Sequence, residues 1–520
     1  QAEERQKQEQ KKDVFLQQGK KATDDTTLPE ETPSFPITTL RMEGDNTGDF
    51  VWLQTMLQPY AGKRIGMQGI NTIVKRLTNS LIDHGYVTTR ILVPEQDLSS
   101  GTLRFVLIPG VISDIRFQDT SMKGHWQNAF PTRPGRILNL RDLEQGLEQM
   151  KRVPSQDAEM QLVPGEKPGE SAVVLSVKQT KPWKVVLSVD DSGYESTGKL
   201  QSSQTFSLDN LFGVNDLFHV SFNSDAEREG QRLGTRGDSI YYSFPLGNST
   251  FTLSSSAYRY HQTFGGINQN FLFSGDSRTT ELSLSQLLHR DQTSKTHLEL
   301  GIAKKKSQSY IDDTEIEVQR KNTTAFKIGL SERRYLGKTV RDVKLTHKQG
   351  VAWFGAQEEP DNLPPGSPTT RYQMWLLDAS IVTPVHIGKT EGRFSTTFSG
   401  QYTNDVLYGS DFFSIGNRYT VRGFDGEGTL SAERGWYLQN ELSLPLDKAG
   451  NEIYFGLDYG RVSGPSAQYL AGRTLAGSVV GLRGGAGNLR YDVFVGWSLK
   501  KPDGFVTATP TYGFQLTCQI

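Results

Sequence analysis

The sequence lacks the features that several large classes of protein need. Its single cysteine, Cys518, excludes an internal disulfide and any zinc site made of several cysteines. No apolar run approaches the roughly 20 residues of a membrane-spanning helix, which excludes a helical membrane protein. The 57 lysines and arginines are balanced by 58 aspartates and glutamates, so the basic excess of a nucleic-acid-binding protein is missing as well. We therefore expect no nucleic-acid partner.

Catalytic and cofactor-binding patterns are also missing from the sequence. The eight histidines show no HExxH spacing, and no Ser-His set stands at the spacing of a hydrolase. The glycine-rich stretch Gly481–Gly487 is not followed by Lys-Ser or Lys-Thr, so we do not interpret it as a phosphate-binding loop. We interpret it as a closely packed part of the wall of the β-barrel predicted below. We expect no enzyme activity, no metal and no cofactor. The chain does not begin with a basic and then apolar segment, and we expect that a signal peptide has been removed.

What the sequence does contain is glycine, aromatic residues and strand-length alternation. There are 52 glycines and 10% aromatic residues, and apolar and polar residues alternate in short segments from Trp183 onward. This alternation is typical of strands with one face in lipid and the other in a polar lumen. The predicted strands lie at 183–189, 198–210, 217–224, 238–246, 250–262, 278–289, 295–310, 322–335, 340–354, 372–387, 391–403, 434–446, 452–462, 474–485, 489–499 and 506–519. We expect a transmembrane β-barrel of about sixteen antiparallel strands over residues 181–520.

Two small α+β units are predicted in front of this barrel. The first, residues 37–109, should contain a strand, two helices and two further strands, and its longer helix at 67–84 carries apolar residues at helical spacing. The second, residues 110–180, repeats this order, with a weak helical stretch at 125–130 and a stronger one at 140–150. The chain is therefore predicted to have two copies of one small domain.

The N-terminal residues are polar on every side. Residues 1–18 contain no Gly or Pro and favour a helix, yet such a helix cannot be packed in an apolar core. It is either solvated or placed in a wet cavity, and we predict that it plugs the barrel lumen. Residues 19–36 collect Thr, Asp, Glu and three prolines, which predicts a flexible linker.

The most informative motif is the segment Thr420–Asp425, which places an arginine in the long connection at 404–433. Counting strands makes this connection the sixth on the outer side. In the predicted strand Ile453–Gly460, the alternation sends the apolar residues toward lipid and Asp458 into the lumen. We predict that the loop folds inward and that Arg422 pairs with Asp458.

With these motifs, the chain resembles the two-partner secretion transporters, the TpsB family of haemolysin, filamentous-haemagglutinin and contact-dependent-inhibition exporters. The matching residues are Val421, Arg422, Gly423 and Phe424 in the loop and Gly456, Asp458 and Gly460 in the strand. The small units resemble POTRA domains, and the polar helix, the linker, two POTRA-like units and the strands follow the family's order. The resemblance implies a bacterial outer-membrane location, POTRA domains in the periplasm, export of a large partner exoprotein, and a functional requirement for Arg422 and Asp458.

Two other functions stay open at this point. Barrel assembly factors share the loop and strand motifs, and a passive gated porin would share the barrel. The presence of two POTRA-like units and an N-terminal helix favours the transporter. Outer-membrane lipid and lipopolysaccharide are expected partners, and the basic run Lys304–Lys306 is usually a solvated loop edge but is also able to contact lipopolysaccharide. We expect a monomer.

Overall fold

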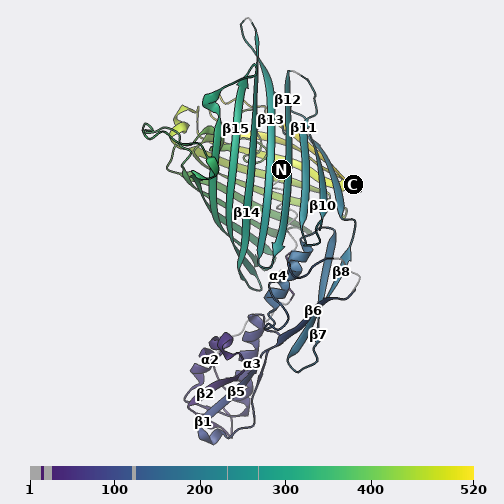
Figure 1. Cartoon of the computed structure of the whole chain (residues 1–520), viewed down its shortest axis with the longest axis vertical. Helices are drawn as coiled ribbons and strands as arrows, with labels where there is room; N and C mark the ends of the chain where they lie inside the picture. The colour runs from purple at the N-terminus through teal and green to yellow at the C-terminus, as the bar shows by residue number, and fades with distance from the viewer. Residues whose placement is uncertain (1–12, 17–25, 120–123, 231, 268) are drawn as a thin grey trace.

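The computed structural model describes residues 13–16, 26–119, 124–230, 232–267 and 269–520. It shows a large closed β-barrel with two small α+β units in a row beyond one end (Figure 1). The expected N-terminal helix over residues 1–18 lies largely outside the described residues. The four that are described, Asp13–Leu16, are not helical, which corrects that part of the prediction.

The first small unit is built from two helices on a three-stranded sheet. Its elements are β1 (Phe35–Ile37), β2 (Thr39–Gly44), α2 (Val51–Leu57), β3 (Lys63–Ile65), α3 (Met67–Asp83), β4 (Arg90–Leu92) and β5 (Thr102–Ile108). The sheet has the order β2-β5-β4, and β1 pairs separately with β3. Ile73, Leu77 and Leu81 of α3 are buried against this sheet at the predicted helical spacing.

The described part of the predicted linker is not free. The carboxylate of Glu31 accepts hydrogen bonds of 2.7 to 3.0 Å from the backbone N–H groups of Gly66, Gln68 and Gly69. These are unpaired amides at the N-terminus of α3, where a negative charge is stabilised. The linker is thereby fixed to the first unit.

The second small unit lies between the first unit and the barrel. It contains β6 (Val111–Phe117), α4 (Leu140–Lys151), β7 (Gln156–Pro164) and β8 (Glu170–Gln179), with the sheet order β6-β8-β7. Asn139 links it to the first unit, because its side chain accepts from the N–H of Arg141 at the start of α4 and donates to the carbonyl of His84 over 3.1 Å.

The predicted helix at 125–130 is wrong. The segment makes one turn only, in which the carbonyl of Trp126 accepts from Ala129 and Phe130. Its other backbone groups bind the barrel, because His125 N donates to Gly213 O over 3.0 Å and Asn128 O accepts from Gly247 N over 2.7 Å. These contacts with the barrel turns replace the hydrogen bonds that a helix would need.

The barrel has sixteen long antiparallel strands, as predicted, and closes between β27 and β9. The strands are β9 (Trp183–Asp190), β10 (Gln201–Asp209), β11 (Leu217–Asp225), β12 (Leu233–Leu246), β13 (Ser249–Gly265), β14 (Asn270–Arg290), β15 (Ser294–Ile311), β17 (Lys321–Leu336), β18 (Thr339–Val351), β19 (Gln373–Ile387), β20 (Thr390–Thr403), β23 (Arg434–Pro445), β24 (Glu452–Ser463), β25 (Thr474–Ala486), β26 (Leu489–Lys500) and β27 (Thr511–Gln519). A two-residue strand, β16 (Thr314–Glu315), extends the hairpin after β15. Closure leaves no strand edge of the sheet unpaired.

The two faces of the barrel wall alternate along each strand. In β24, Tyr454, Gly456 and Asp458 are buried on the inner face, while Phe455 and Leu457 are exposed on the outer face. The connections at the end near the small units are short turns, and most of those at the other end are longer. The connection 404–433 is the sixth at this far end and contains β21 (Phe413–Ile415) and β22 (Leu430–Ala432).

The described helices are all short or amphipathic. None of them is both long and apolar enough to cross a membrane. The remaining helical segments are single 3-10 turns: η1 (Thr47–Phe50), η2 (Gln58–Tyr60), η3 (Leu98–Ser100), η4 (Glu317–Gln319), η5 (Trp353–Gly355), η6 (Gly409–Asp411) and η7 (Pro465–Tyr469).

Candidate functional site

The loop 404–433 is folded against the inner wall of the barrel. Its hairpin of β21 and β22 shares an apolar cluster with residues of β24 and β25. Val421 and Phe424 are buried in this cluster, and the ring of Phe424 meets that of Phe505 edge to face, with centroids 5.8 Å apart. Burial of these side chains favours the inward position of the loop over a solvated one.

Arg422 lies in this loop, and its side chain reaches Asp458 on the inner face of β24. Nε donates to Oδ2 over 2.7 Å, and Nη2 donates to Oδ1 over 2.9 Å. The backbone N–H of Arg422 donates to the same Oδ2 over 2.9 Å. One carboxylate, whose side chain is completely buried, therefore fixes both the guanidinium and the loop backbone.

A second acid from the neighbouring strand completes this contact. Nη1 of Arg422 donates to Oε2 of Glu441 over 2.5 Å, and Nη2 of Arg483 donates to the other oxygen, Oε1, over 2.7 Å. Burial by itself lowers the pKa of Arg422, but Asp458 and then Glu441 raise it above its ordinary value. The guanidinium stays charged, and we call Arg422, Glu441, Asp458 and Arg483 the loop anchor.

Glycines allow the loop and the wall to come this close. A Cβ on Gly456 would stand 2.5 Å from Nη2 of Arg422, and one on Gly460 would stand 2.7 Å from Cγ2 of Val421. Gly423 has a φ of +95°, a backbone conformation that residues with a side chain rarely adopt. The structure thus places all the motif residues found in the sequence within one contact region.

Sequence reasoning missed part of the anchor. Glu441 stands opposite Gly456 in the strand register, and Arg483 lies in the glycine-rich stretch that was expected only to pack closely. A Cβ on Gly477 would overlap the carbonyl oxygen of Arg422. The sequence signal that could have revealed this part of the anchor was Glu441, which the alternation places on the inner face of the strand before the one that carries Asp458.

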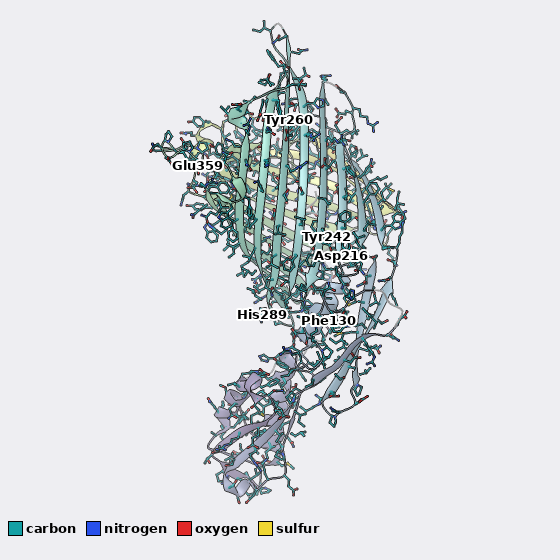
Figure 2. All side chains as sticks on the ribbon, viewed as in Figure 1. Phe130, Asp216, Tyr242, Tyr260, His289 and Glu359 are labelled. Atoms are coloured by element: carbon teal, nitrogen blue, oxygen red, sulfur yellow. The ribbon has the colours of Figure 1, made fainter. Side chains whose placement is uncertain are left out.

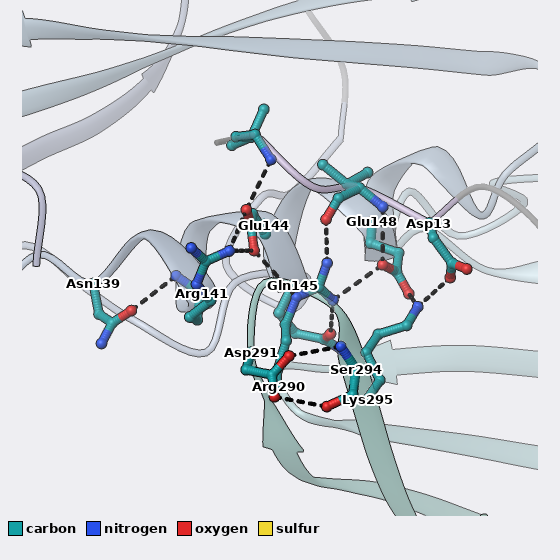
Figure 3. Close-up of polar contacts among 12 residues, drawn as sticks. Asp13, Asn139, Arg141, Glu144, Gln145, Glu148, Arg290, Asp291, Ser294 and Lys295 are labelled. Atoms are coloured by element: carbon teal, nitrogen blue, oxygen red, sulfur yellow. Dashed lines mark hydrogen bonds and ion pairs between the residues drawn. The ribbon is translucent and has the colours of Figure 1, made fainter. Parts of the chain in front are cut away.

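A second charged cluster lies at the mouth of the barrel, where α4 meets the turn between β14 and β15 (Figure 3). Arg290 donates from Nη1 to Oε2 of Glu148 over 3.0 Å and from Nε to Oε2 of Glu144 over 3.4 Å. Lys295 pairs with Oε1 of Glu148 at 2.7 Å, and Arg141 pairs with Glu144, which is completely buried. We call Asp13, Arg141, Glu144, Glu148, Arg290 and Lys295 the mouth cluster.

The N-terminal segment Asp13–Leu16 lies in this cluster. The N–H groups of Val14 and Leu16 donate to Glu148 and Glu144 over 3.3 and 2.8 Å, and the carbonyl of Val14 accepts from Arg290. These side-chain partners replace the intrahelical bonds that a helix would make here. The carboxylate of Asp13 pairs with Lys295 and Arg333; burial favours its neutral form, yet the two cations lower its pKa below the ordinary value.

Hydrogen bonds to uncharged groups of the barrel also fix the second unit beside the mouth cluster. Asn215, in the turn after β10, donates to the carbonyl of His125 over 2.8 Å and to Oδ1 of Asn128 over 3.1 Å. Arg152 donates to Oγ of Ser243 on β12 over 2.6 Å. Figure 2 shows Phe130 at this junction. The second unit is therefore docked on the barrel turns.

The described residues contain no group of His, Cys, Asp and Glu suited to a metal ion. What the geometry supports is mechanical: a loop held inside a barrel, and a small domain and an N-terminal segment held at its mouth. A closed antiparallel barrel with an apolar outer face is the architecture of an outer-membrane protein.

The comparisons with known proteins identify the family. The chain belongs to the haemolysin secretion/activation proteins ShlB/FhaC/HecB, whose model matches residues 169–484. A POTRA domain of the ShlB type matches residues 35–110, and a further POTRA domain matches residues 111–164. The protein is thus a two-partner secretion transporter of the outer membrane with periplasmic POTRA domains.

Relatives and solved structures agree with this assignment. The outer membrane transporter CdiB-2 of Burkholderia pseudomallei is 44% identical over 512 residues, covering 95% of this chain and 88% of the relative. The haemolysin transporter protein ShlB of Serratia marcescens is 29% identical over 445 residues, covering 84% and 77%. The structure of CdiB from Escherichia coli superposes with a TM-score of 0.90 at 26% identity, covering 99% of this chain and 96% of the other. These relatives are transporters.

Proposed function

We propose that this transporter carries one large partner exoprotein across the outer membrane through its barrel lumen. The POTRA domains bind the unfolded partner in the periplasm, and no catalytic activity takes part. The transporter acts as a monomer, surrounded by outer-membrane lipid and lipopolysaccharide. The observation that carries the proposal is the loop anchor, because a loop bound inside the lumen through Arg422 has to be held or moved when a chain passes.

The route of the partner passes both charged clusters. The mouth cluster binds α4 and the segment Asp13–Leu16 at the periplasmic end, and the loop anchor lies further along the lumen. Both are held by charge-assisted hydrogen bonds, which are strong when dry and weaken once water reaches them. A partner segment that admits water would loosen both clusters in this way, with no nucleotide required.

The second POTRA domain offers a place for partner binding. In its described sheet, β7 pairs with β8 on one side only, whereas residues 135–138 hydrogen-bond along the outer side of β6 at Ile112. Such an edge accepts an extended peptide by strand addition. Removing residues 110–180 is expected to abolish secretion while a folded barrel remains, which heat-modifiable migration on gels reports. Normal secretion by this variant would rule out partner binding by the second domain.

We further propose that residues 1–18 plug the lumen at rest. The support is the position of Asp13, which is bound at the mouth by Lys295 and Arg333. Deleting residues 1–18 is expected to raise single-channel conductance in planar bilayers, while secretion survives because the plug must leave during transport. Unchanged conductance would contradict the proposal that residues 1–18 plug the lumen.

Photocrosslinking from β7 separates this function from the two alternatives. A transporter should crosslink to one large secreted protein, whereas a barrel assembly factor should crosslink to newly made barrel proteins. A passive porin should crosslink to neither and should pass solutes without a partner. Crosslinks to several unrelated barrel proteins, with none to a secreted protein, would contradict the proposal.

A further inference from the structure

The outer face of strands β12 to β15 carries an apolar band that ends abruptly in basic residues. Leu253 on β13 and Leu282 on β14 face each other in register and are 46% and 56% exposed. Ile302 on β15 stands opposite Leu282. These residues mark the lipid-facing side of the wall, since exposed apolar residues on the outside of a barrel meet acyl chains.

Toward the end of the barrel away from the POTRA domains, the same face becomes basic. Alternate residues of a strand point the same way, so Arg259 shares the face of Leu253, Arg278 that of Leu282, and Lys306 that of Ile302. Arg236 extends the row onto β12, where it stands opposite Arg259. All four basic side chains are exposed, and among the described residues none of them forms an ion pair or a side-chain hydrogen bond.

Two pairs in this row set like charges directly opposite each other. Arg236 faces Arg259 across β12 and β13, and Arg278 faces Lys306 across β14 and β15. Such pairs destabilise a sheet when they are left alone. Two acids, Asp238 and Asp276, share this surface with the four residues and Lys304, and Asp276 stands opposite Arg259 on β13. Five basic residues against two acids leave the basic charges in excess. The arrangement therefore favours a bound anion.

A small groove lies beside Arg278 on the same surface. It has a volume of about 210 Å³, and its lining includes Phe222, Ile240, Ser255 and Ala257 together with the acid Asp238. The groove adjoins the apolar band, because Ser255 lies two residues after Leu253 on the same face of β13. An anionic group at Arg278 can thus be attached to an apolar group along the wall.

Aromatic residues place this level of the wall at the membrane surface. Trp353 and Phe354, just after β18, are 49% and 64% exposed, and Trp353 contacts Phe326 on β17. Lys304 donates to the carbonyl of Phe354. Exposed aromatic residues next to an apolar band are typical of the girdle where lipid headgroups lie. The basic row is therefore at headgroup height.

We propose that Arg236, Arg259, Arg278 and Lys306 form a binding site for the phosphorylated glycolipid of the outer leaflet, lipopolysaccharide. Its phosphates bind between the facing basic pairs, where arginine makes two-point contacts, and its acyl chains lie on Leu253, Leu282 and Ile302. The inference rests on the outer-membrane setting of the proposed function, but it concerns the outside of the barrel and not the pore.

The test compares Arg278→Gln/Lys306→Gln with Lys305→Gln. Lys305 is the adjacent residue of β15 and points into the lumen, so its variant removes a similar charge without touching the site. Purified full-length proteins are titrated with lipopolysaccharide, with dephosphorylated lipopolysaccharide and with phosphatidylglycerol, while thermal unfolding and native mass spectrometry report binding. Lipopolysaccharide should stabilise the parent and Lys305→Gln alike, and the double variant should need roughly tenfold more.

Three outcomes would overturn the site. They are equal binding by the double variant, equal stabilisation by the dephosphorylated lipid, and equal stabilisation by phosphatidylglycerol, which would show an unselective anion site. Heat-modifiable migration shows whether each variant forms the barrel, and the two single variants supply the comparison if the double variant does not. Secretion is measured in the same strains. Normal secretion with lost binding leaves the transport function intact, and absence of secretion by the unsubstituted protein with normal lipopolysaccharide binding counts against the transport function alone.

Discussion

The loop anchor and the mouth cluster are both centred on an arginine, but they join different parts of the molecule. Arg422 joins a loop to the wall of its own barrel, and its acidic partners are 19 and 36 residues away. Arg290 joins a barrel turn to α4 and to the N-terminal segment, with partners 146 and 276 residues away. The first contact lies within one domain, whereas the second is a joint between three parts of the chain.

We therefore expect the loop anchor to contribute mainly to the stability of the barrel, and the mouth cluster mainly to the docking of the second POTRA domain. Asp458 accepts three hydrogen bonds from Arg422 and has no other cation among its described hydrogen-bond partners. In the mouth cluster, Glu144 keeps Arg141 and Glu148 keeps Lys295 when Arg290 is removed. Breaking the anchor therefore leaves a buried charge alone, while breaking the mouth cluster leaves its charges partly paired.

The largest effect is expected for Arg422→Ala. It leaves the buried carboxylate of Asp458 without its cation, so the free energy of unfolding should fall by about 3 kcal/mol and secretion should fall with it. Arg422→Lys is the matched control, because it keeps the charge but loses the two-point contact with Asp458. Its stability and secretion should lie between those of the unsubstituted protein and those of Arg422→Ala. Thermal melting and the amount of exoprotein in the medium measure these changes. Full secretion with unchanged melting would show that the anchor neither holds the loop nor serves transport.

A double-mutant cycle sharpens the description of the anchor. Asp458→Asn and Glu441→Gln are each combined with Arg422→Ala, and the free energy of unfolding is measured for all variants. The coupling should be about 2 kcal/mol for Asp458 and smaller for Glu441, because Glu441 accepts only one of the bonds from Arg422 and shares its charge with Arg483. Equal couplings would mean that the three hydrogen bonds to Asp458 carry no special weight.

Arg290→Ala should affect docking more than barrel stability. Removing this side chain should loosen α4 and the segment Asp13–Leu16 at a cost of about 1–2 kcal/mol, because Arg141 and Lys295 still neutralise the glutamates. Limited proteolysis between the second POTRA domain and the barrel should become faster, while barrel melting stays close to that of the parent. His289→Ala, at an exposed neighbouring position, is the control. A loss of barrel melting as large as that of Arg422→Ala would erase the distinction between the clusters.

The smallest effect is expected for Asp13→Asn. Its carboxylate has a lowered pKa, so its contribution is complete above its ordinary value of 3.8 and is lost only as the pH falls through the lowered folded-state value. The contact with Lys295 and Arg333 is therefore intact at neutral pH, and removing it should cost about 1 kcal/mol. Single-channel conductance of the variant should rise at neutral pH, and that of the parent only in strong acid. A parent channel that opens already near pH 6 would contradict this order.

The barrel could be predicted from the sequence because its signal is local. A strand in a lipid-facing wall alternates every second residue, and the segments predicted on that basis correspond to the sixteen strands. The same alternation placed Asp458 on the inner face of β24, where the structure has it against Arg422. The boundaries were less certain at the outer ends: β14 begins at Asn270 rather than 278, because a hairpin extends beyond the lipid-facing segment.

The turn at 125–130 shows where local reasoning failed. Its composition suggested a weak helix, but its backbone groups are taken by Gly213 and Gly247 of two barrel turns. The mouth cluster was invisible for the same reason, because Glu144 and Arg290 look like ordinary surface charges in their own segments. The sequence around Glu144 and the sequence around Arg290 contain no pattern that identifies the other residue as a partner.

The sequence by itself determined the barrel, its two small domains, the inward loop and the motif that closes it, because alternation, helical spacing and glycine act over a few residues. Only the tertiary structure decided that Glu441 and Arg483 complete the anchor, that α4 is docked by buried ion pairs, and that two like-charged pairs meet on the outer wall. These depend on strand register and on contacts between distant segments. A charge can be read from the sequence, but its partner is fixed only when the chain has folded.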